Sequence, residues 1–301
     1  MDGSCAISLA TKSEYMLNCA LMKIFSLLTA LAIAGSFVST AAADTLKING
    51  STTVNPVVAE AAEILRAENQ LDIQVDTQGG SAGGISMLAD GLVQLGMISK
   101  HISDDDKAKH PKVNFVENTI GVDSVAIIVS KDVWDNGVRA LSKQQLQDIY
   151  EGKITNWNQL GGAKSQRIAF FNKEPGRGTW EVFVHWVYGS PKAAPQVSFP
   201  EVGGNEETRN KVASTRGAMS QLSASWADGQ KVFALAMVLE DGRKVEPTND
   251  NIANKTYPLS RPLTVLSNGP VTGTAKTMLD FLLSDRGQAL LPKHGYMNLK
   301  Q

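Results

Sequence analysis

The sequence predicts an α/β protein with two lobes, and three observations support this prediction. Short apolar or alternating runs alternate with helical patterns after residue 44, which is typical of βαβ units with a mostly parallel sheet. Two strongly apolar runs, residues 122–130 and 257–267, stand about one lobe apart and indicate strands that cross between lobes. Small-residue turns at Gly50 and Gly79 each lead directly into a helical pattern.

Residues 1–43 are predicted to be an upstream segment and a signal peptide. Met22 and Lys23 form a short basic start, residues 25–38 are apolar but short for a membrane span, and three alanines precede Asp44. Because the residues before Met22 lack signal character, we expect translation to start there and the mature chain to start at Asp44. The expected location is the periplasm, reached through a cleaved signal peptide.

The composition of the mature chain argues against several classes of protein. Both cysteines precede Asp44, so no disulfide is expected, and Cys19 precedes the apolar run instead of ending it, which argues against lipid attachment. Two of the 29 basic and two of the 30 acidic residues also precede Asp44, which leaves a net charge of −1. This balance makes nucleic acid and anionic membranes poor candidates as partners. We expect a monomer.

The first part of lobe 1, residues 44–124, is predicted to alternate strands with helices. We expect a helix from Pro56 to about Glu68, with Asn55 at its N-cap. Its apolar residues share one face, as packing against a sheet requires. The strands are expected at residues 46–48, 73–77 and 95–98.

Residues 125–258 are expected to form lobe 2, and residues 259–301 to return to lobe 1. In lobe 2, Ser142 and Gln145 form a capping-box pattern at the start of a helix. The pattern of residues 217–239 is mixed and predicts no single element. Two lobes joined by two crossings enclose a cleft. The returning helices are expected at residues 274–283 and 284–291.

The two small-residue turns, and a third that starts at Gly176, are predicted to bind an anion. The first turn of a helix leaves backbone N–H groups without partners, and the aligned peptide dipoles add partial positive charge there. Glycine and serine allow the backbone to approach closely, so a tetrahedral oxyanion fits such a helix end. One such turn can cap an ordinary helix, whereas three of the same kind favour a shared function.

Six segments of the mature chain together resemble the periplasmic phosphate-binding proteins of ABC importers. The runs IYEGKITNWNQLGG at Ile149 and YPLSRPL at Tyr257 are specific to that family. The resemblance implies a type II periplasmic binding protein fold, whose two lobes close on one phosphate and deliver it to a membrane permease. The other segments are GSTTV at Gly50, QGGSAGG at Gln78, IGVDSVAIIVSKD at Ile120 and EPGRGTWEVF at Glu174.

By position, the resemblance implies that hydroxyl and amide donors from both lobes hold the phosphate. Those of the first lobe are Ser51, Thr52, Thr53, Ser81 and Gly83. Those of the second lobe are Gly178 and Thr179.

Four further candidates stand where this chain departs from the family pattern. Lys173 stands where the family usually has Arg, and Arg177 where it has Ser. Ser99 and Lys100 occupy a place at which family members carry an Asp or a Ser-Arg pair. A guanidinium contacts two anion oxygens at once, whereas a lysine ammonium is a single mobile charge. These changes are therefore expected to loosen the geometric selection of the anion, unless the guanidinium of Arg177 restores the two-point contact.

Phosphate at neutral pH keeps a proton, so a site that prefers phosphate over sulfate benefits from a carboxylate acceptor. Asp123 is the leading candidate and Glu174 a weaker one; the alternative for Asp123 is a structural carboxylate near the crossing. The alternative for Lys100 is a solvated surface charge. Arg261 is expected to be a structural arginine that pairs across the crossing, and Trp157 a packing residue.

The leading hypothesis is a solute receptor that binds inorganic phosphate and carries out no covalent step. No cofactor is expected, and no metal, because the four histidines show no metal-ligand spacing. The alternatives are a receptor for sulfate or another tetrahedral oxyanion, a secreted phosphoesterase with Ser81 or Thr179 as nucleophile, and an exported sensor or adhesion protein.

Overall fold

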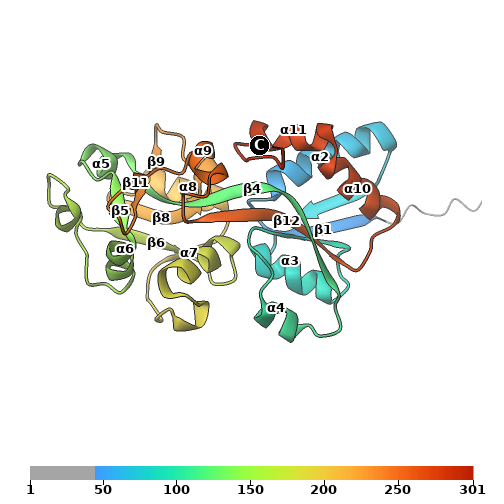
Figure 1. Ribbon diagram of the computed structural model, residues 1–301, viewed down its shortest axis with the longest axis horizontal. Coiled ribbons are helices and arrows are strands. Elements are labelled where there is room, and N and C mark those ends of the chain that lie inside the picture. The colour runs from blue at the N-terminus through green and yellow to red at the C-terminus, as the bar shows by residue number, and fades with distance from the viewer. Residues whose placement is uncertain (1–44, 301) are drawn as a thin grey trace, which may run out of the picture. The chain divides into compact units, whose positions relative to one another are not determined.

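The computed structural model describes residues 45–300, which form two lobes joined by two long strands (Figure 1). The expectations for the signal peptide and for translation from Met22 lie outside the described residues. Between residues 45 and 300, every helix is too short or too polar to traverse a bilayer.

Lobe 1 is a sheet with helices on both faces. One face carries a core cluster formed with three helices, and a fourth helix packs on a separate cluster at the other face. The parallel strands, which confirm the three predicted ones, are β1 (Leu46–Gly50), β2 (Ile73–Asp76) and β3 (Leu95–Ile98). The helices of the first face are α2 (Asn55–Asn69), α10 (Gly273–Leu283) and α11 (Asp285–Lys293), which confirms both predicted C-terminal helices. The fourth is α3 (Gly80–Ala89), and the short α4 (Asp104–Lys109) follows β3.

The N-cap of α2 is Val54, so the prediction of Asn55 at this position was wrong. Val54 makes no side-chain cap hydrogen bond. The backbone turn replaces the side-chain cap, because the carbonyl of Ser51 accepts hydrogen bonds from the N–H groups of Val54 and Asn55. Pro56 lies in the first turn, as predicted, where its missing N–H costs nothing.

The strand β4 (Phe115–Ser130) joins the lobes and is longer than predicted. It pairs antiparallel with β12 (Ser260–Asn268) up to Ser124, and with β8 (Ala218–Ser223) from Val125 onwards. The strand therefore changes partner between Ser124 and Val125. Figure 1 shows β4 and β12 running side by side between the lobes. The lobe boundaries after residues 124 and 258 stay predictions.

Lobe 2 continues the sheet of lobe 1. Its further strands are β6 (Ala169–Lys173), β7 (Glu201–Val202) and β9 (Val232–Ala234). Over the described residues this gives a nine-stranded sheet in the order β2-β1-β3-β12-β4-β8-β6-β7, with β9 beside β4. A three-stranded sheet contains β11 (Lys244–Val245), β10 (Ala236–Val238) and β5 (Ala140–Ser142). Residues 217–239 had a mixed pattern because they hold several short strands and a 3-10 turn.

The helices of lobe 2 surround these strands, and the predicted capping box is confirmed at one of them. Ser142 Oγ accepts a hydrogen bond from the backbone N–H of Gln145 at 3.2 Å, and Gln145 Oε1 accepts one from Ser142 N–H at 2.9 Å. The α-helices are α5 (Lys131–Asp135), α6 (Lys143–Tyr150), α7 (Gly178–Tyr188), α8 (Asn205–Ser214) and α9 (Asn249–Ala253). The 3-10 turns are η1 (Trp157–Leu160), η2 (Pro191–Ala193) and η3 (Ala224–Trp226).

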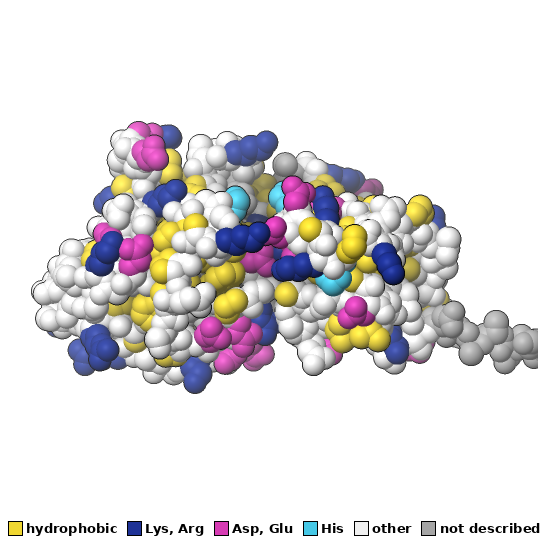
Figure 2. Space-filling view, turned by 90° about the horizontal axis from the view of Figure 1, so that it is seen from below, with side chains coloured by type: hydrophobic (Ala, Val, Ile, Leu, Met, Phe, Trp, Pro, Cys, Tyr) yellow, Lys and Arg dark blue, Asp and Glu magenta, His cyan; other side chains and the backbone are white. Residues whose placement is uncertain are grey.

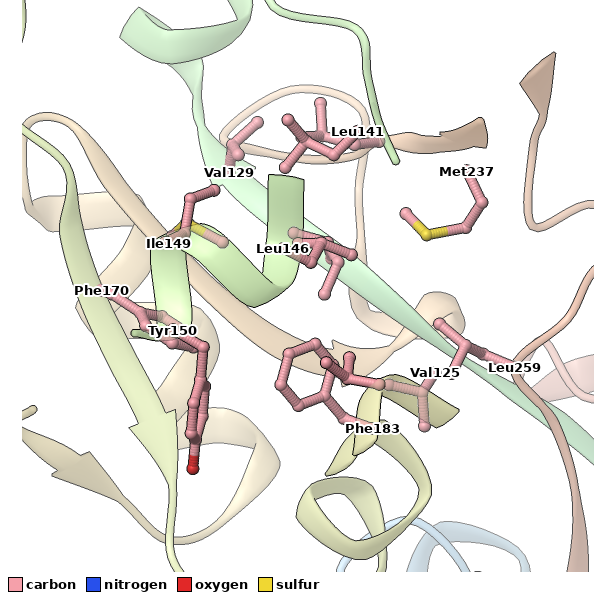
Figure 3. Packing of buried hydrophobic residues seen from close by; sticks show 14 of the residues in the cluster. Val125, Val129, Leu141, Leu146, Ile149, Tyr150, Phe170, Phe183, Met237 and Leu259 are labelled. Carbon is pink, nitrogen blue, oxygen red and sulfur yellow. The ribbon is translucent and has the colours of Figure 1, made fainter. Parts of the chain in front are cut away.

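The core of lobe 2 is built on α6. Figure 3 shows Leu146, Ile149 and Tyr150 of this helix in the same cluster as Phe170 and Phe183. The ring of Tyr150 lies 5.9 Å from that of Phe170 and 5.7 Å from that of Phe183, within the range of favourable aromatic contacts. This core holds β6 and α7 in place, and both elements carry residues of the site described below.

Trp157 is a fully buried packing residue of this core, as predicted, and its Nε1 donates to the carbonyl of Gly217 at 2.9 Å. We expect Trp157→Phe to lower the free energy of unfolding by about 1 to 3 kcal/mol, because the hydrogen bond and part of the ring volume are lost. Urea unfolding measures the change. The matched control is Trp186→Phe, because Trp186 is half-buried and its Nε1 makes no hydrogen bond within residues 45–300. Equal losses in both variants would contradict the role given to Trp157.

Candidate functional site

Four helix N-termini, two from lobe 1 and two from lobe 2, meet around a small hollow. The hollow is narrow, with a volume of about 10 Å³. Each of these helix ends presents backbone N–H groups and partial positive charge. Their residues are Ser51, Thr52 and Thr53 before α2, Gly80 and Ser81 in α3, Gly178 and Thr179 in α7, and Gly203 and Asn205 at the start of α8. The remaining lining residues are Ser99, Lys173 and Arg177.

Buried hydroxyl groups around the hollow are held by Arg261. Its Nη1 donates to Thr179 Oγ1 at 2.9 Å and to Ser99 Oγ at 3.2 Å, and its Nη2 donates to Thr53 Oγ1 at 3.2 Å. Asn205 Nδ2 also donates to Thr53 Oγ1, at 3.0 Å. Because these hydroxyl oxygens already accept hydrogen bonds, their own hydrogens remain to be donated. The hydroxyl groups are therefore set to act as donors toward a guest in the hollow.

Arg261 is itself fixed by Asp123 across the two crossing strands, which confirms the predicted structural pairing. The two residues lie directly opposite each other in the β4–β12 pair. Arg261 Nε and Nη2 donate to Asp123 Oδ2 at 3.0 and 2.8 Å, and Ser223 Oγ donates to Asp123 Oδ1 at 2.8 Å. Both side chains are buried, at 1% and 3% exposure. The pair gives the site a rigid base at the junction of the lobes.

Lys173 at the end of β6 is a buried cation held by neutral oxygen atoms. Its Nζ lies 2.7 Å from the carbonyl of Gly203 and 2.6 Å from Thr208 Oγ1, with the Gly204 carbonyl at 3.1 Å. Among the described residues no carboxylate forms an ion pair with this ammonium. Burial, with smaller effects from the charges of Arg177 and Arg261, lowers the pKa of Lys173 to about 7.

The two lobes touch at the hollow, so the structure has a closed cleft. The backbone N–H of Ala82 in lobe 1 donates to the carbonyl of Gly176 in lobe 2 at 3.0 Å. Lys192 of lobe 2 also pairs with Asp105 of lobe 1 at 2.6 Å. Figure 2 shows acidic and basic side chains gathered along the seam between the lobes on the face that it presents.

The structure brings most of the predicted site residues together. Nine of the twelve line the hollow, and their contact with a ligand stays a prediction. These are Ser51, Thr52, Thr53, Ser81, Ser99, Lys173, Arg177, Gly178 and Thr179.

Three predicted residues do not line the hollow, which corrects the expectation for each. Gly83 lies inside α3, where a Cβ would collide with the carbonyl of Gln78 at 2.0 Å, so close packing explains this glycine. Asp123 is occupied by Arg261 and Ser223 and fits the structural alternative.

Lys100 is neither a hollow-lining residue nor a solvated surface charge. It is buried, and its Nζ lies 2.5 Å from both Asp106 Oδ2 of lobe 1 and Glu181 Oε2 of lobe 2. Burial raises the pKa of Glu181. Lys100 therefore links the lobes beside the hollow.

Four residues of the site were not predicted from the sequence. Arg261 was predicted as a structural residue, but its contacts with the hydroxyl groups could not be read from the sequence. Gly80, Gly203 and Asn205 line the hollow directly. Gly203 and Asn205 belong to the run VGGNEE at the start of α8, which is a fourth small-residue turn before a helix. Its small residues and the helix that follows give it the same sequence pattern as the other three turns.

A family model described as a PBP superfamily domain matches residues 36–286. The phosphate-binding protein PstS of Bacillus subtilis is 34% identical over 258 residues, which cover 85% of this chain and 81% of the relative. The chain belongs to the PstS family of the PBP superfamily. PstS of Staphylococcus saprophyticus is also similar to this PstS-family chain, at 27% identity over 83% of it and 82% of the relative.

Solved structures agree with the assignment of this chain to the PstS family. A putative phosphate ABC transporter substrate-binding protein from Clostridium perfringens, crystallised with bound phosphate, superposes with a TM-score of 0.75 at 31% identity. The match covers 85% of this chain and all of the other. An ABC-type phosphate transport receptor from Vibrio cholerae gives a TM-score of 0.66 at 29% identity, over 84% and 99% of the two chains. The predicted two-lobed periplasmic binding protein fold is thus confirmed.

Proposed function

We propose that this PstS-family protein captures inorganic phosphate between its lobes and delivers it to the permease of an ABC importer. It acts in the periplasm as a monomer, and it carries out no covalent chemistry. Phosphate binding by the named relatives supports the choice of ligand. An empty open form and a liganded closed form would differ by a hinge motion at β4 and β12.

One observation carries this proposal: the hollow is lined by donors that converge from both lobes. Helix N-termini, hydroxyl groups that already accept hydrogen bonds, and the cations Lys173 and Arg177 surround the same space. Such groups stabilise an oxyanion by charge-assisted hydrogen bonds, which outweigh the cost of removing water from it only when they are already oriented. Arg261 provides this orientation.

Titration calorimetry on ligand-stripped protein tests the proposal, with phosphate, arsenate, sulfate and molybdate as ligands. We expect saturable binding of one phosphate per chain. Thr179→Val removes one hydroxyl donor and is expected to weaken binding by about 1 to 3 kcal/mol. The matched control is Thr277→Val on the exposed side of α10, which should bind as the unmodified protein does. The absence of saturable binding to all four anions would refute the proposal.

A receptor for sulfate or another fully deprotonated oxyanion is the second candidate. No carboxylate lines the hollow among the described residues, and Asp123 is paired with Arg261 outside the lining. The proton of bound phosphate therefore meets no carboxylate acceptor, and the preference for phosphate over sulfate must be modest. The calorimetric ratio of the two affinities decides between the candidates.

A phosphoesterase has less support. Ser81 Oγ accepts a hydrogen bond from the backbone N–H of Ser99, and Thr179 Oγ1 accepts one from Arg261. Within residues 45–300, no histidine lines the hollow to act as a base for either hydroxyl. These contacts favour binding without turnover.

Phosphate affinity is expected to fall as the pH rises above about 7. The pKa of Lys173 lies near 7 in the folded protein, so Lys173 loses its charge in this range, whereas a bound anion favours the charged form. The phosphate affinity should fall by at most about tenfold per pH unit. For the empty protein the sign is opposite: above pH 7 the unfolded chain holds this proton more strongly, so stability rises with pH. Calorimetry between pH 6.5 and 8.5 measures the affinity.

Lys173→Arg is the matched control for this prediction, because a guanidinium stays charged throughout the range. The titration of free phosphate affects both proteins equally and cancels in the comparison. Identical pH profiles for the two proteins would show that Lys173 does not titrate here.

A further inference from the structure

The side chain of Arg177 crosses from lobe 2 to lobe 1 at the solvent side of the hollow. Arg177 is the N-cap residue of α7. A Cβ placed on Gly80 of lobe 1 would lie 2.6 Å from Arg177 Cδ and 3.1 Å from Nη1. A Cβ placed on Gly203 would lie 2.8 Å from Nη2. The guanidinium therefore occupies a slot between two glycines, and any larger side chain at either position would close that slot.

The burial of the lining residues identifies this side as the entrance. Of the twelve residues around the hollow, all are buried except Thr52 and Arg177. The side chain of Arg177 keeps 17% exposure. An anion that enters or leaves the closed form must pass these two residues, and Arg177 is the larger of them.

The hydrogen bonds of Arg177 leave one end of its guanidinium available. Nε and Nη2 both donate to Glu174 Oε2, at 2.9 and 2.7 Å. Nη1 makes no hydrogen bond with any residue from 45 to 300. Glu174 thus holds the group in place from the solvent side, while Nη1 remains free to donate to a guest.

Arg177 differs in this respect from the other cation of the hollow. Lys173 is fully buried, and four oxygen atoms of the Gly203 to Thr208 segment surround its Nζ. Lys173 cannot move without breaking these contacts. Arg177 has one partly exposed partner and can swing out into solvent.

We propose that Arg177 is the gate of the anion site and determines how long the anion stays bound. This inference rests on the proposed function and deepens it. In the closed form the guanidinium covers the hollow between Gly80 and Gly203 and donates to the anion through Nη1. It must leave the slot, either by its own motion or as the lobes part, before the anion can dissociate, so it acts mainly on the dissociation rate.

The release of labelled phosphate from the full protein after dilution into excess unlabelled phosphate tests the gate. We expect Arg177→Ser to raise the dissociation rate by roughly 10- to 100-fold with a smaller change in the association rate. Arg177→Lys keeps a positive charge but lacks the planar guanidinium, so its dissociation rate should lie between those of the unmodified protein and Arg177→Ser. Arg243→Ser is the matched control, because it removes an exposed arginine of the same lobe that pairs only with Asp241 of that lobe, and should release phosphate at the unmodified rate.

Gly80→Ala provides an independent variant, because its methyl group displaces the Arg177 side chain without replacing Arg177 itself. Gly80 has a left-handed backbone (φ +58°), so thermal melting must accompany this variant. We expect fast release in Gly80→Ala and little further increase in the double variant with Arg177→Ser, because both changes open the same slot.

The release experiments distinguish failure of the gate proposal from failure of the proposed function. If the unmodified protein binds phosphate and the Arg177→Ser variant releases it at the same rate, the gate is overturned and the receptor stands. Additive effects of the Gly80 and Arg177 changes also overturn the gate. If the unmodified protein binds no oxyanion, both proposals fail together.

Discussion

Replacing Asp123 with asparagine is expected to lower the free energy of unfolding by about 3 to 5 kcal/mol, because it leaves the guanidinium of Arg261 buried without a counter-charge. Asp123 and Arg261 are almost completely buried and in contact at 2.8 Å. The asparagine has nearly the same shape, so the loss reports on charge more than on packing. Urea unfolding followed by tryptophan fluorescence measures it.

The control for this prediction is an ion pair of the same kind at the surface. Arg286 contacts Glu68 at 2.7 Å, with about half or more of each side chain exposed to solvent. Glu68→Gln should shift the unfolding midpoint very little, because solvent screens the pair. If the two variants unfold at the same urea concentration, the Asp123–Arg261 pair does not support the fold as described.

The stability effect has a functional counterpart. Arg261 orients the hydroxyl groups of Thr53, Ser99 and Thr179 toward the hollow. A displaced guanidinium would leave these hydroxyl groups free to rotate and to donate elsewhere. The Asp123→Asn variant should therefore also bind phosphate more weakly, although Asp123 itself does not touch the hollow.

The helix N-termini of the site could be predicted from the sequence because they are local features. A small-residue turn followed by helical periodicity specifies where N–H groups lack partners, and this needs only a few neighbouring residues. Ser51, Ser81 and Thr179 line the hollow for this reason. The convergence of the three turns on one point was implied only by the family resemblance.

The roles of the charged residues could not be predicted in the same way. Asp123 meets Arg261 because of the register of two strands, and the residues are 138 positions apart in the chain. Lys100 meets Glu181 only after α7 has packed against lobe 1. The place that a long side chain reaches depends on such tertiary contacts. Lys100 and Asp123 were therefore predicted in the hollow from their sequence positions, but neither residue lines it.

Replacing Gly178 with alanine is expected to weaken phosphate binding by about 3 kcal/mol, or roughly 150-fold, because the added methyl group blocks closure of the lobes. A Cβ at Gly178 in lobe 2 would lie 2.7 Å from both Ser81 Oγ and Ser99 Oγ, and 2.9 Å from the Ser99 carbonyl, all in lobe 1. These are short side chains and backbone, which cannot move aside. The lobes must therefore stay apart.

The stability of the empty protein should change in the opposite direction, which separates blocked closure from misfolding. Gly178 starts α7, where alanine is favoured over glycine by up to about 1 kcal/mol, so the unfolding midpoint without ligand should hold or rise. Gly204→Ala is the matched control: it faces Thr52 across the same cleft, but its Cβ would lie at an ordinary 3.7 Å. The lobes of the Gly204→Ala variant should close, and the variant should bind phosphate with the unmodified affinity. A Gly178→Ala variant that binds as tightly as Gly204→Ala would mean that the ligand is held without the lobe contact seen here.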